Sequence, residues 1–429
     1  HRMAATGEVD KSEAGDTAAV LPRPFCGSTC PLLIIGAWQL SAGHSTHADQ
    51  QAKAHSADAL LAYAKAGLSC FDCADIYTGV EELLGMAQVA DQKLRIHTKC
   101  VPDLDVMMSG NVTCQYLEAG IMRSLNRLQM DALDLVQLHW WEYEVPGFEQ
   151  ACRHLGELMT HGLIRTLGLT NTDLKHLRGL VEAGCQVASN QVQLSLLDRR
   201  PLESGMAAFC ECHGIELLCY GVLAGGFLTD RWLGQEDPGF EGLENRSLTK
   251  YRLIIDEYGS WEDFQRLLRC MDAIARRRGT NVAGVAVGWV LRRQCRTRAI
   301  LGARKAQHAA GMAASLHLAL GDRDMAELNA QVAGRGIKGE VFEAERAGGR
   351  HTGIMRRNLN GVGGPAHLAE CLERTKTALA RNPVIRPHLH REIELLRALG
   401  NDVSSIEEAL QAQPAAKCAR READEAATR

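Results

Sequence analysis

Two side chains that can take part in proton transfer, Asp72 and Tyr77, lie five residues apart in the segment FDCADIY. Asp72 follows an apolar run, and the apolar runs that come later in the chain also end on polar or aromatic residues. These residues are Lys99, His139, Thr170, Asn171, Gln191, Tyr220 and Arg304. In a (β/α)8 barrel the carboxyl ends of all strands meet at one face, so this distribution favours a single site there.

The chemistry that this set favours is proton donation to a carbonyl oxygen, with Tyr77 as the acid. A free phenol has a pKa of about 10, and a nearby ammonium group lowers that value. We expect Lys99 to supply the ammonium, Asp72 to hold it in place and His139 to orient the substrate oxygen. The hydride cannot come from a side chain, so a nicotinamide cofactor is implied.

Each of these residues also has a simpler interpretation. Asp72 and Lys99 could form a structural ion pair at a barrel rim, and His139 could be a hydrogen-bonded core histidine. Tyr77 could do no more than cap its strand. Lys99 could instead form a Schiff base, as in an aldolase, but such a lysine is desolvated away from carboxylates and Asp72 is expected nearby. The presence of all four at matching strand ends favours the proton-transfer site.

Composition limits the classes of protein to consider. The 429 residues are 46% hydrophobic with a net charge of −4, which is typical of a soluble globular protein and offers no basis for nucleic-acid or membrane-surface binding. No apolar stretch approaches the ~18 residues of a membrane span. The first residues, HRMAATGEVDKSEAGDTAAV, contain no apolar signal core. We therefore expect a cytoplasmic protein, with the possibilities of a longer reading frame or of import into an organelle left open.

The cysteines predict reduced thiols and no metal site. There are 15 of them, an odd number, and most lie inside apolar segments. Cys70 and Cys73 spell C-x-x-C, but alternate residues of a strand point to opposite faces and cannot pair easily. Two other groups lack the second half of a zinc pattern, namely Cys26 with Cys30, and Cys210 with Cys212 and His213.

Short apolar runs alternate with longer stretches of helical periodicity between residues 32 and 328. The predicted strands are 32–38, 68–77, 94–100, 133–140, 164–171, 186–195, 215–221 and 298–304. The predicted helices include 50–66, 113–128, 147–161, 201–213, 261–278 and 282–293. Strands that are apolar throughout and separated by helices predict a parallel sheet, and eight such units favour a closed (β/α)8 TIM barrel.

Three regions follow from this pattern: a flexible segment at 1–30, the barrel at 31–330, and a C-terminal extension at 331–429 that is irregular, partly helical and disordered at its end. Inside the barrel, 222–252 is a long Gly-rich segment that could fold over a bound ligand. The extension begins with an irregular stretch that could cross the barrel mouth, form a subunit contact or lie as a solvated strap. The oligomeric state is open.

Five segments resemble the aldo-keto reductase superfamily over about 70% of the chain. They are FDCADIY followed by EELLG, GLIRTLGLTN, NQVQLSLLDRR, YGVLAGGFL and AILGARK. The resemblance implies a (β/α)8 barrel and an NADP-dependent aldo-keto reductase, an oxidoreductase that reduces aldehydes or ketones. The matching catalytic residues are Asp72, Tyr77, Lys99 and His139, with Tyr77 as the proton donor.

The resemblance also implies how a cofactor is held. Thr170, Asn171 and Gln191 would hold the nicotinamide carboxamide, and Tyr220 would stack on its ring. Further cofactor contacts would come from Trp38, Leu223, Gly225, Gly226, Arg304, Lys305 and His308. NADP(H) is favoured because a guanidinium at Arg304 suits a 2′-phosphate, and NAD(H) is the alternative. The substrate, a small carbonyl compound, would lie against Trp38, Trp140, Trp141 and Tyr143.

The sequence departs from the family pattern in places that bear on the cofactor. Thr170 stands where serine is usual, and Gly221-Val222 replaces a common Ser-Pro. Gly311 and Met312 stand where the family often has glutamate and asparagine, so weaker adenine contacts are expected. One rival function remains beside the reductase, a cofactor-binding regulatory module on the same fold with little turnover.

Overall fold

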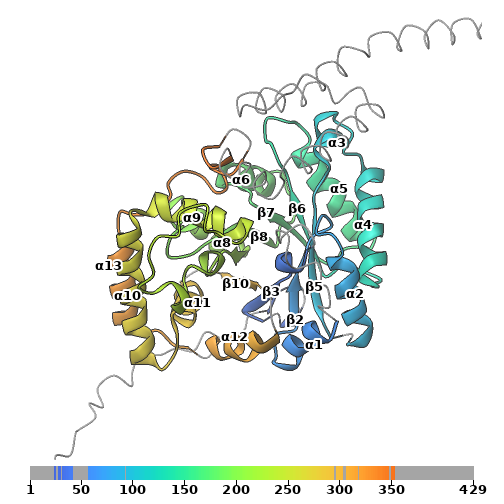
Figure 1. Cartoon of the computed structure of the whole chain (residues 1–429). Coiled ribbons are helices and arrows are strands. Elements are labelled where there is room, and N and C mark those ends of the chain that lie inside the picture. The colour runs from blue at the N-terminus through green and yellow to red at the C-terminus, as the bar shows by residue number, and fades with distance from the viewer. Residues whose placement is uncertain are drawn as a thin grey trace, which may run out of the picture. The chain divides into compact units, whose positions relative to one another are not determined.

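A computed structural model describes most of the region between residues 24 and 352. The described residues are 24–25, 28–29, 31–41, 57–91, 93–293, 296–302, 306–316, 318–346 and 349–352. Within them, eight parallel strands close into a barrel, and helices surround it (Figure 1). This confirms the predicted (β/α)8 barrel.

The barrel strands follow one another around the barrel in sequence order, and the last pairs with the first. They are β3 (Leu33–Gly36), β4 (Cys70–Asp72), β5 (Arg95–Cys100), β6 (Leu135–His139), β7 (Leu167–Thr170), β8 (Ser189–Gln193), β9 (Glu216–Tyr220) and β10 (Thr297–Gly302). Each of the eight predicted runs contains or overlaps one of these strands.

Helices cover the barrel, with α2, α4 and α5 on one side and α10 and α13 on the other (Figure 1). They are α1 (Ala57–Lys65), α2 (Val80–Ala90), α3 (Leu104–Met108), α4 (Cys114–Leu128), α5 (Phe148–Thr160), α6 (Leu174–Glu182), α7 (Arg200–Glu203), α8 (Met206–His213), α9 (Arg246–Tyr258), α10 (Trp261–Arg278), α11 (Val282–Leu291), α12 (Ala309–Ser315) and α13 (Asp322–Val332). In the described part of the chain, no helix combines the length and apolarity needed to cross a membrane.

Two predicted elements differ from the sequence pattern in a way that bears on the site or the helix order. The run at 68–77 is a strand only to Asp72, after which the backbone turns and the Tyr77 N–H donates to the Ala74 carbonyl at 3.0 Å. Tyr77 therefore stands on a turn. The helix predicted at 201–213 is two helices, α7 and α8, separated at Gly205, whose φ of 85° lies in the left-handed region.

The apolar side chains form two clusters on the two faces of the strands. The larger cluster fills the space between strands and helices, and it includes Phe71 and Val136. The smaller cluster lies inside the barrel and contains Phe25, Ile34, Cys70, Leu135, Leu218 and Ile300. Cys70 and Cys73 belong to different clusters, as the period-2 alternation of a strand requires.

Part of the segment expected to be flexible forms a short hairpin. Its strands, β1 (Pro24–Phe25) and β2 (Ser28–Thr29), pair antiparallel. The Phe25 side chain is 6% exposed and packs among the residues inside the barrel, including Ile34 and Leu135. The hairpin therefore contributes a side chain to the interior of the barrel.

The first part of the C-terminal extension packs on the barrel after α13. We call residues 335–346 the strap. Arg199 donates to the Arg335 carbonyl at 2.8 Å, and Arg200 forms an ion pair with Glu345 at 3.0 Å. The two arginines lie at the start of α7, Arg199 as its N-cap and Arg200 as its first residue, so residues almost 150 positions apart in the sequence are held together. Residues 353–429 lie outside the described residues.

Candidate active site

The centre of the site is a buried ion pair between Asp72, at the end of β4, and Lys99 on β5. Lys99 Nζ donates to Asp72 Oδ2 at 2.6 Å and to the Cys73 carbonyl at 2.7 Å. Burial alone would lower the pKa of Lys99, but the charge and the hydrogen bond of Asp72, together with Tyr77 and Cys73, outweigh burial and the pKa is raised. The amine is therefore an ammonium at neutral pH.

Two carboxamides hold the other oxygen of Asp72. Gln137 Nε2 donates to Asp72 Oδ1 at 2.9 Å, and Gln191 Nε2 donates to the same atom at 2.7 Å. Gln191 also donates to Gln137 Oε1 at 2.9 Å. Gln191, which the sequence assigned to the cofactor, also contacts Asp72. Gln137 was missed, although it lies two residues before His139 on one strand and must share its face.

Tyr77 lies beside this pair. The Lys99 ammonium is 5.3 Å from the centroid of the Tyr77 ring. The centroids of the Trp38 and Tyr77 rings are 4.8 Å apart. Burial raises the pKa of Tyr77 above its ordinary value, and the charge of Lys99 opposes that rise without overcoming it. The phenol is therefore protonated in the free protein. The expected lowering of the Tyr77 pKa below that of a free phenol is not found, because burial raises it.

His139, at the end of β6, is the fourth residue of the set. Its Nδ1 lies 3.5 Å from the Thr170 carbonyl oxygen, and its ring meets the edge of Trp141 at a centroid distance of 4.4 Å. Burial, together with the charges of Arg346 and Lys99, lowers the pKa of His139 to about 4. The imidazole is neutral at physiological pH and offers a single N–H donor.

The ends of β7 and β9 meet on another side of the site. Tyr220 donates its hydroxyl to Asn171 Oδ1 at 2.9 Å, and Asn171 has a φ of 55°, a left-handed conformation that asparagine tolerates better than most residues. The Thr170 hydroxyl donates to the Gln191 carbonyl at 3.2 Å. The Lys250 ammonium lies 4.9 Å from the centroid of the Tyr220 ring.

The turn after β9 packs tightly against α9, and this packing requires glycine. A Cβ atom on Gly221 would lie 2.3 Å from the Tyr251 hydroxyl, and one on Gly225 would lie 2.7 Å from the Tyr251 ring. Both glycines also have positive φ, at 72° and 65°. Leu223, between them, leads into the short 3₁₀ helix η4 (Ala224–Gly226). Packing against Tyr251 therefore accounts for Gly221 and Gly225, whereas a Cβ atom on Gly226 would meet nothing within 4 Å.

Two cations of α9 border this region without a carboxylate within ion-pair distance among the described residues. They are Arg246 and Lys250, which lie one helical turn apart, and burial lowers the pKa of each. Both side chains are partly buried, and the charge of Glu345 opposes the lowering of the Lys250 pKa from beyond ion-pair distance; cations in this setting suit an anionic ligand such as a phosphate. Of the residues expected to bind the 2′-phosphate, His308 is exposed on η6 (Ala306–His308), while Arg304 and Lys305 lie outside the described residues.

The four aromatic residues expected in the substrate pocket do not all face the site. Trp38 and Trp141 contact Tyr77 and His139, as described above. Trp140 is 2% exposed, packs against Phe148 of α5, and donates its indole N–H to the Val145 carbonyl.

Tyr143 lies under the strap. Its ring stacks on the His176 ring, with 3.5 Å between the two centroids. The Arg346 guanidinium lies over the same ring, 4.0 Å from its centroid.

The strap supplies two residues that the sequence pattern did not reveal. Phe342 brings its ring within 5.8 Å of the His139 ring, with a φ of 63° that is unusual for a bulky side chain. Arg346 donates to three backbone carbonyls at strand ends, those of Trp140 at 3.0 Å, Trp141 at 2.8 Å and Asn171 at 2.8 Å. The strap therefore contacts residues at the carboxyl ends of the strands, at the barrel mouth.

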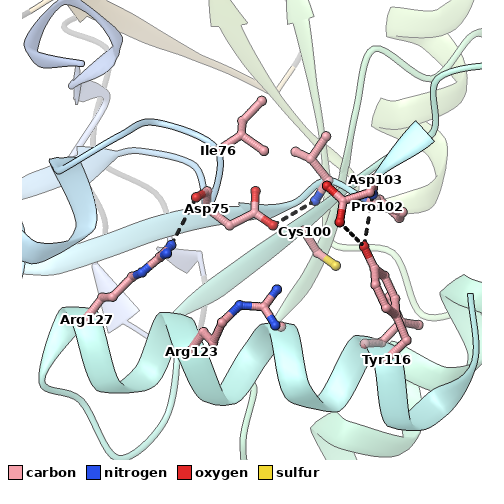
Figure 2. Close-up of a pocket in the computed structure, with 11 residues that line it drawn as sticks. Asp75, Ile76, Cys100, Pro102, Asp103, Tyr116, Arg123 and Arg127 are labelled. Carbon is pink, nitrogen blue, oxygen red and sulfur yellow. Dashed lines mark hydrogen bonds between the residues drawn. The ribbon is translucent and has the colours of Figure 1, made fainter. Parts of the chain in front are cut away.

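A separate cavity of about 120 Å³ lies behind the turn that carries Tyr77 (Figure 2). Asp75 and Arg123 face it from opposite sides, and Cys100 and Tyr116 also line it (Figure 2). Asp75 Oδ2 accepts from the Val101 N–H at 3.1 Å, whereas Oδ1 is buried without a hydrogen-bond partner. Burial raises the pKa of Asp75 from its usual 3.8 to about 7. None of the four proposed catalytic residues lines this cavity.

Comparison with known proteins identifies the family. Residues 32–333 match the aldo/keto reductase family, and the chain belongs to it. The chain is 23% identical over 313 residues to the NADH-specific methylglyoxal reductase of Escherichia coli (strain K12), an alignment that covers 68% of this chain and 91% of that protein. It is 29% identical over 280 residues to the chloroplastic pyridoxal reductase of Arabidopsis thaliana, covering 60% and 71% of the two chains.

Solved structures show the same fold. The glycerol dehydrogenase of Gluconobacter oxydans superposes with a TM-score of 0.60 at 22% identity, over 75% of this chain and 98% of that one. An aldo/keto reductase from Klebsiella pneumoniae, solved in complex with NADP and acetate, gives a TM-score of 0.55 at 23% identity, over 73% and 96%. At these sequence identities the structural similarity shows the fold alone.

Proposed function

We propose that this protein reduces aldehydes or ketones to alcohols with NAD(P)H, and that Tyr77 donates the proton. The observation that carries the proposal is the Lys99 ammonium, held by Asp72 at 2.6 Å and lying 5.3 Å from the centroid of the Tyr77 ring. A proton donor must be protonated at rest, and burial keeps Tyr77 so. The same ammonium stabilises the phenolate that remains once the proton has been given away.

The other residues have supporting roles in this proposal. Neutral His139 has one N–H, and in this proposal its proton is on Nε2, where it donates to the carbonyl oxygen and fixes its position beside Tyr77; the 3.5 Å contact between Nδ1 and the Thr170 carbonyl is then not a hydrogen bond. Trp38 and Trp141 form apolar walls that exclude water from the reacting carbon. Gln137 and Gln191 keep Asp72 in place, so that its second oxygen stays on Lys99.

The cofactor proposal rests on the face formed by β7, β9 and α9. A bound nicotinamide supplies the hydride that the side chains lack. In this proposal Tyr220 meets the nicotinamide ring and Asn171 its carboxamide, and the contact between these two side chains and the charges of Arg246 and Lys250 support it. We favour NADP(H), as in the Klebsiella pneumoniae complex, while the Escherichia coli relative is NADH-specific.

Tyr77→Phe is the direct test. It removes the donated proton and leaves the ring, so we expect turnover of a panel of aldehydes and ketones to fall by about 100-fold to 10,000-fold. NADPH affinity, followed by fluorescence titration, should stay within about twofold. Tyr63→Phe, a buried tyrosine of α1, is the matched control and should keep full activity.

Two outcomes would contradict the proposal. Full turnover in Tyr77→Phe would assign proton donation to another group. Tight NADPH binding by the native protein without turnover of any carbonyl compound would favour the regulatory module instead.

A further inference from the structure

A group of metal-binding side chains lies on the outer wall of the barrel, between two neighbouring helices. Cys114 is the first residue of α4, and His154 and Glu157 lie one turn apart on α5. Their ligand atoms all lie within 4.8 Å of one another. A thiol, an imidazole and a carboxylate together form a donor set that zinc and related divalent cations prefer, and one that calcium or magnesium does not.

Two of the three distances between the donor atoms, those that involve Glu157, are close to those of a tetrahedral centre, and the third is within 4.8 Å. His154 Nδ1 is 3.3 Å from Glu157 Oε2, and Cys114 Sγ is 3.8 Å from the same oxygen. Around a zinc ion with ordinary bond lengths, the corresponding edges of a tetrahedron measure about 3.3 Å and about 3.5 Å. Both edges are therefore close to their bound lengths before any ion is present.

The second nitrogen of His154 has a partner suited to a ligating imidazole. The carboxamide nitrogen of Gln150 is 3.1 Å from His154 Nε2, and the two carboxamide atoms can exchange places by rotation of the amide. A histidine that binds a metal through Nδ1 carries its proton on Nε2 and commonly donates it to such an oxygen. Gln150, one turn before His154 on α5, thus fits the orienting role.

Charge and access also favour a cation here. Glu157 is exposed and contributes a negative charge, and Glu118, one turn after Cys114 on α4, raises the negative charge of the same surface. His154 is only partly buried, with 19% of its side chain exposed, so an ion reaches the group from solvent. The simpler interpretation is a surface contact between His154 and Glu157 with a nearby thiol.

We propose that Cys114, His154 and Glu157 bind one zinc-class divalent cation, with water in the fourth position. The ion would join α4 to α5 and would stand apart from the catalytic residues, none of which belongs to the group. It displaces a proton from the Cys114 thiol on binding, and no electron transfer is involved. The expectation of no metal site came from sequence spacing, which does not register residues brought together from two helices.

Cobalt(II) tests the proposal because its spectrum reports the ligands. Full-length protein, stripped with a chelator and loaded with NADPH, would be titrated with Co²⁺ and then with Zn²⁺ in competition. We expect one equivalent of Co²⁺ to give tetrahedral absorption and a thiolate-to-cobalt charge-transfer band, both abolished by one equivalent of Zn²⁺. Cys114→Ser should remove the charge-transfer band, and Cys114→Ser and His154→Gln should each weaken Zn²⁺ binding by about 100-fold or more.

Two further variants distinguish this site from other thiols and from general damage. Gln150→Leu should weaken binding by about 10-fold, since it removes only the orienting contact. Cys212→Ser, which alters an exposed cysteine of α8, should leave the titration unchanged. A cobalt spectrum without the thiolate band, or Zn²⁺ affinity that is equal in Cys114→Ser and the native protein, would overturn the proposal.

Discussion

At the scale of single residues, the two oxygens of Asp72 divide their work. Oδ2 holds the Lys99 ammonium, and Oδ1 accepts from both Gln137 and Gln191. Asp72 is only 4% exposed, and a carboxylate buried to this extent is stable only if its oxygens accept hydrogen bonds. Here one ammonium group and two carboxamides donate those hydrogen bonds. The orientation of Lys99 therefore depends on residues that do not touch Tyr77.

Gln137→Leu tests this dependence. The change removes one of two donors to Asp72 Oδ1 at a fully buried position, and we expect the free energy of unfolding to fall by about 1–3 kcal/mol. Turnover should fall as well, because the carboxylate gains freedom to rotate away from Lys99. Urea denaturation and steady-state kinetics measure the two effects. Gln115→Leu, at an exposed position of α4, is the control, and equal stability of the two variants would contradict the argument.

Asp75 offers a test by pH. Its pKa in the folded protein is about 7 instead of 3.8, so the fold favours the protonated acid. Stability that depends on this proton is complete below about pH 4 and is lost as the pH rises toward 7. The Asp75→Asn variant has no charge at this position at any pH, so it does not lose this stability. Its free energy of unfolding should exceed that of the native protein by a small amount at pH 5 and by more at pH 8, with an upper limit of about 4 kcal/mol.

Urea denaturation at the two pH values would measure that advantage. Asp103→Asn, at the exposed rim of the same cavity, serves as the control. An Asp75→Asn advantage that does not change with pH would show that the buried carboxyl group is not the titrating group.

At the scale of elements, α12 stands where the family often carries polar contacts to adenine. Gly311 is exposed, and a Cβ atom on it would meet nothing within 4 Å, so a larger side chain fits without rearrangement. We expect Gly311→Glu combined with Met312→Asn to tighten NADPH binding on the order of 10-fold through the added hydrogen bonds. Fluorescence titration measures the NADPH affinity, and Gly179→Glu of α6 is the control. Unchanged affinity in the double variant would refute the expectation.

The strap is a second element with a measurable role. Arg346 satisfies three carbonyls at the ends of β6 and β7, and Arg346→Met would leave all three without that donor. We expect faster proteolytic cleavage within the strap and a loss of about 10-fold to 100-fold in kcat/KM, because Phe342 would no longer be fixed beside His139. Arg323→Met, which breaks an exposed pair on α13, should change neither. Unaltered cleavage of Arg346→Met would exclude Arg346 as the anchor.

At the scale of the whole molecule, the order of elements could be predicted from the sequence and the long-range contacts could not. The alternation of apolar runs with helical periodicity gave the eight strands, because a parallel barrel buries both faces of each strand. The four proposed catalytic residues also followed from their places near strand ends. Phe342 and Arg346 did not, since no local pattern links a residue near position 340 to strands that end near 140 and 171.

Smaller differences have local causes. The run 68–77 is apolar enough for a strand, yet the chain turns after Asp72, and periodicity alone does not show where an apolar segment stops being extended. Trp140 and Trp141 are adjacent, and a strand end sends neighbours to opposite sides, so only one of them contacts His139. The position of Gln137 was predictable from the same alternation.

Segments outside the eight repeats reach both the interior and the mouth of the barrel. Phe25 comes from the hairpin before the first barrel strand, and the strap comes after α13. During synthesis the hairpin leaves the ribosome long before the strands that surround Phe25, whereas the strap emerges after all of them. A nascent chain that stops short of residue 340 therefore contains every repeat of the barrel and lacks the Phe342 ring beside His139. That contact forms only once the last part of the described region has been made.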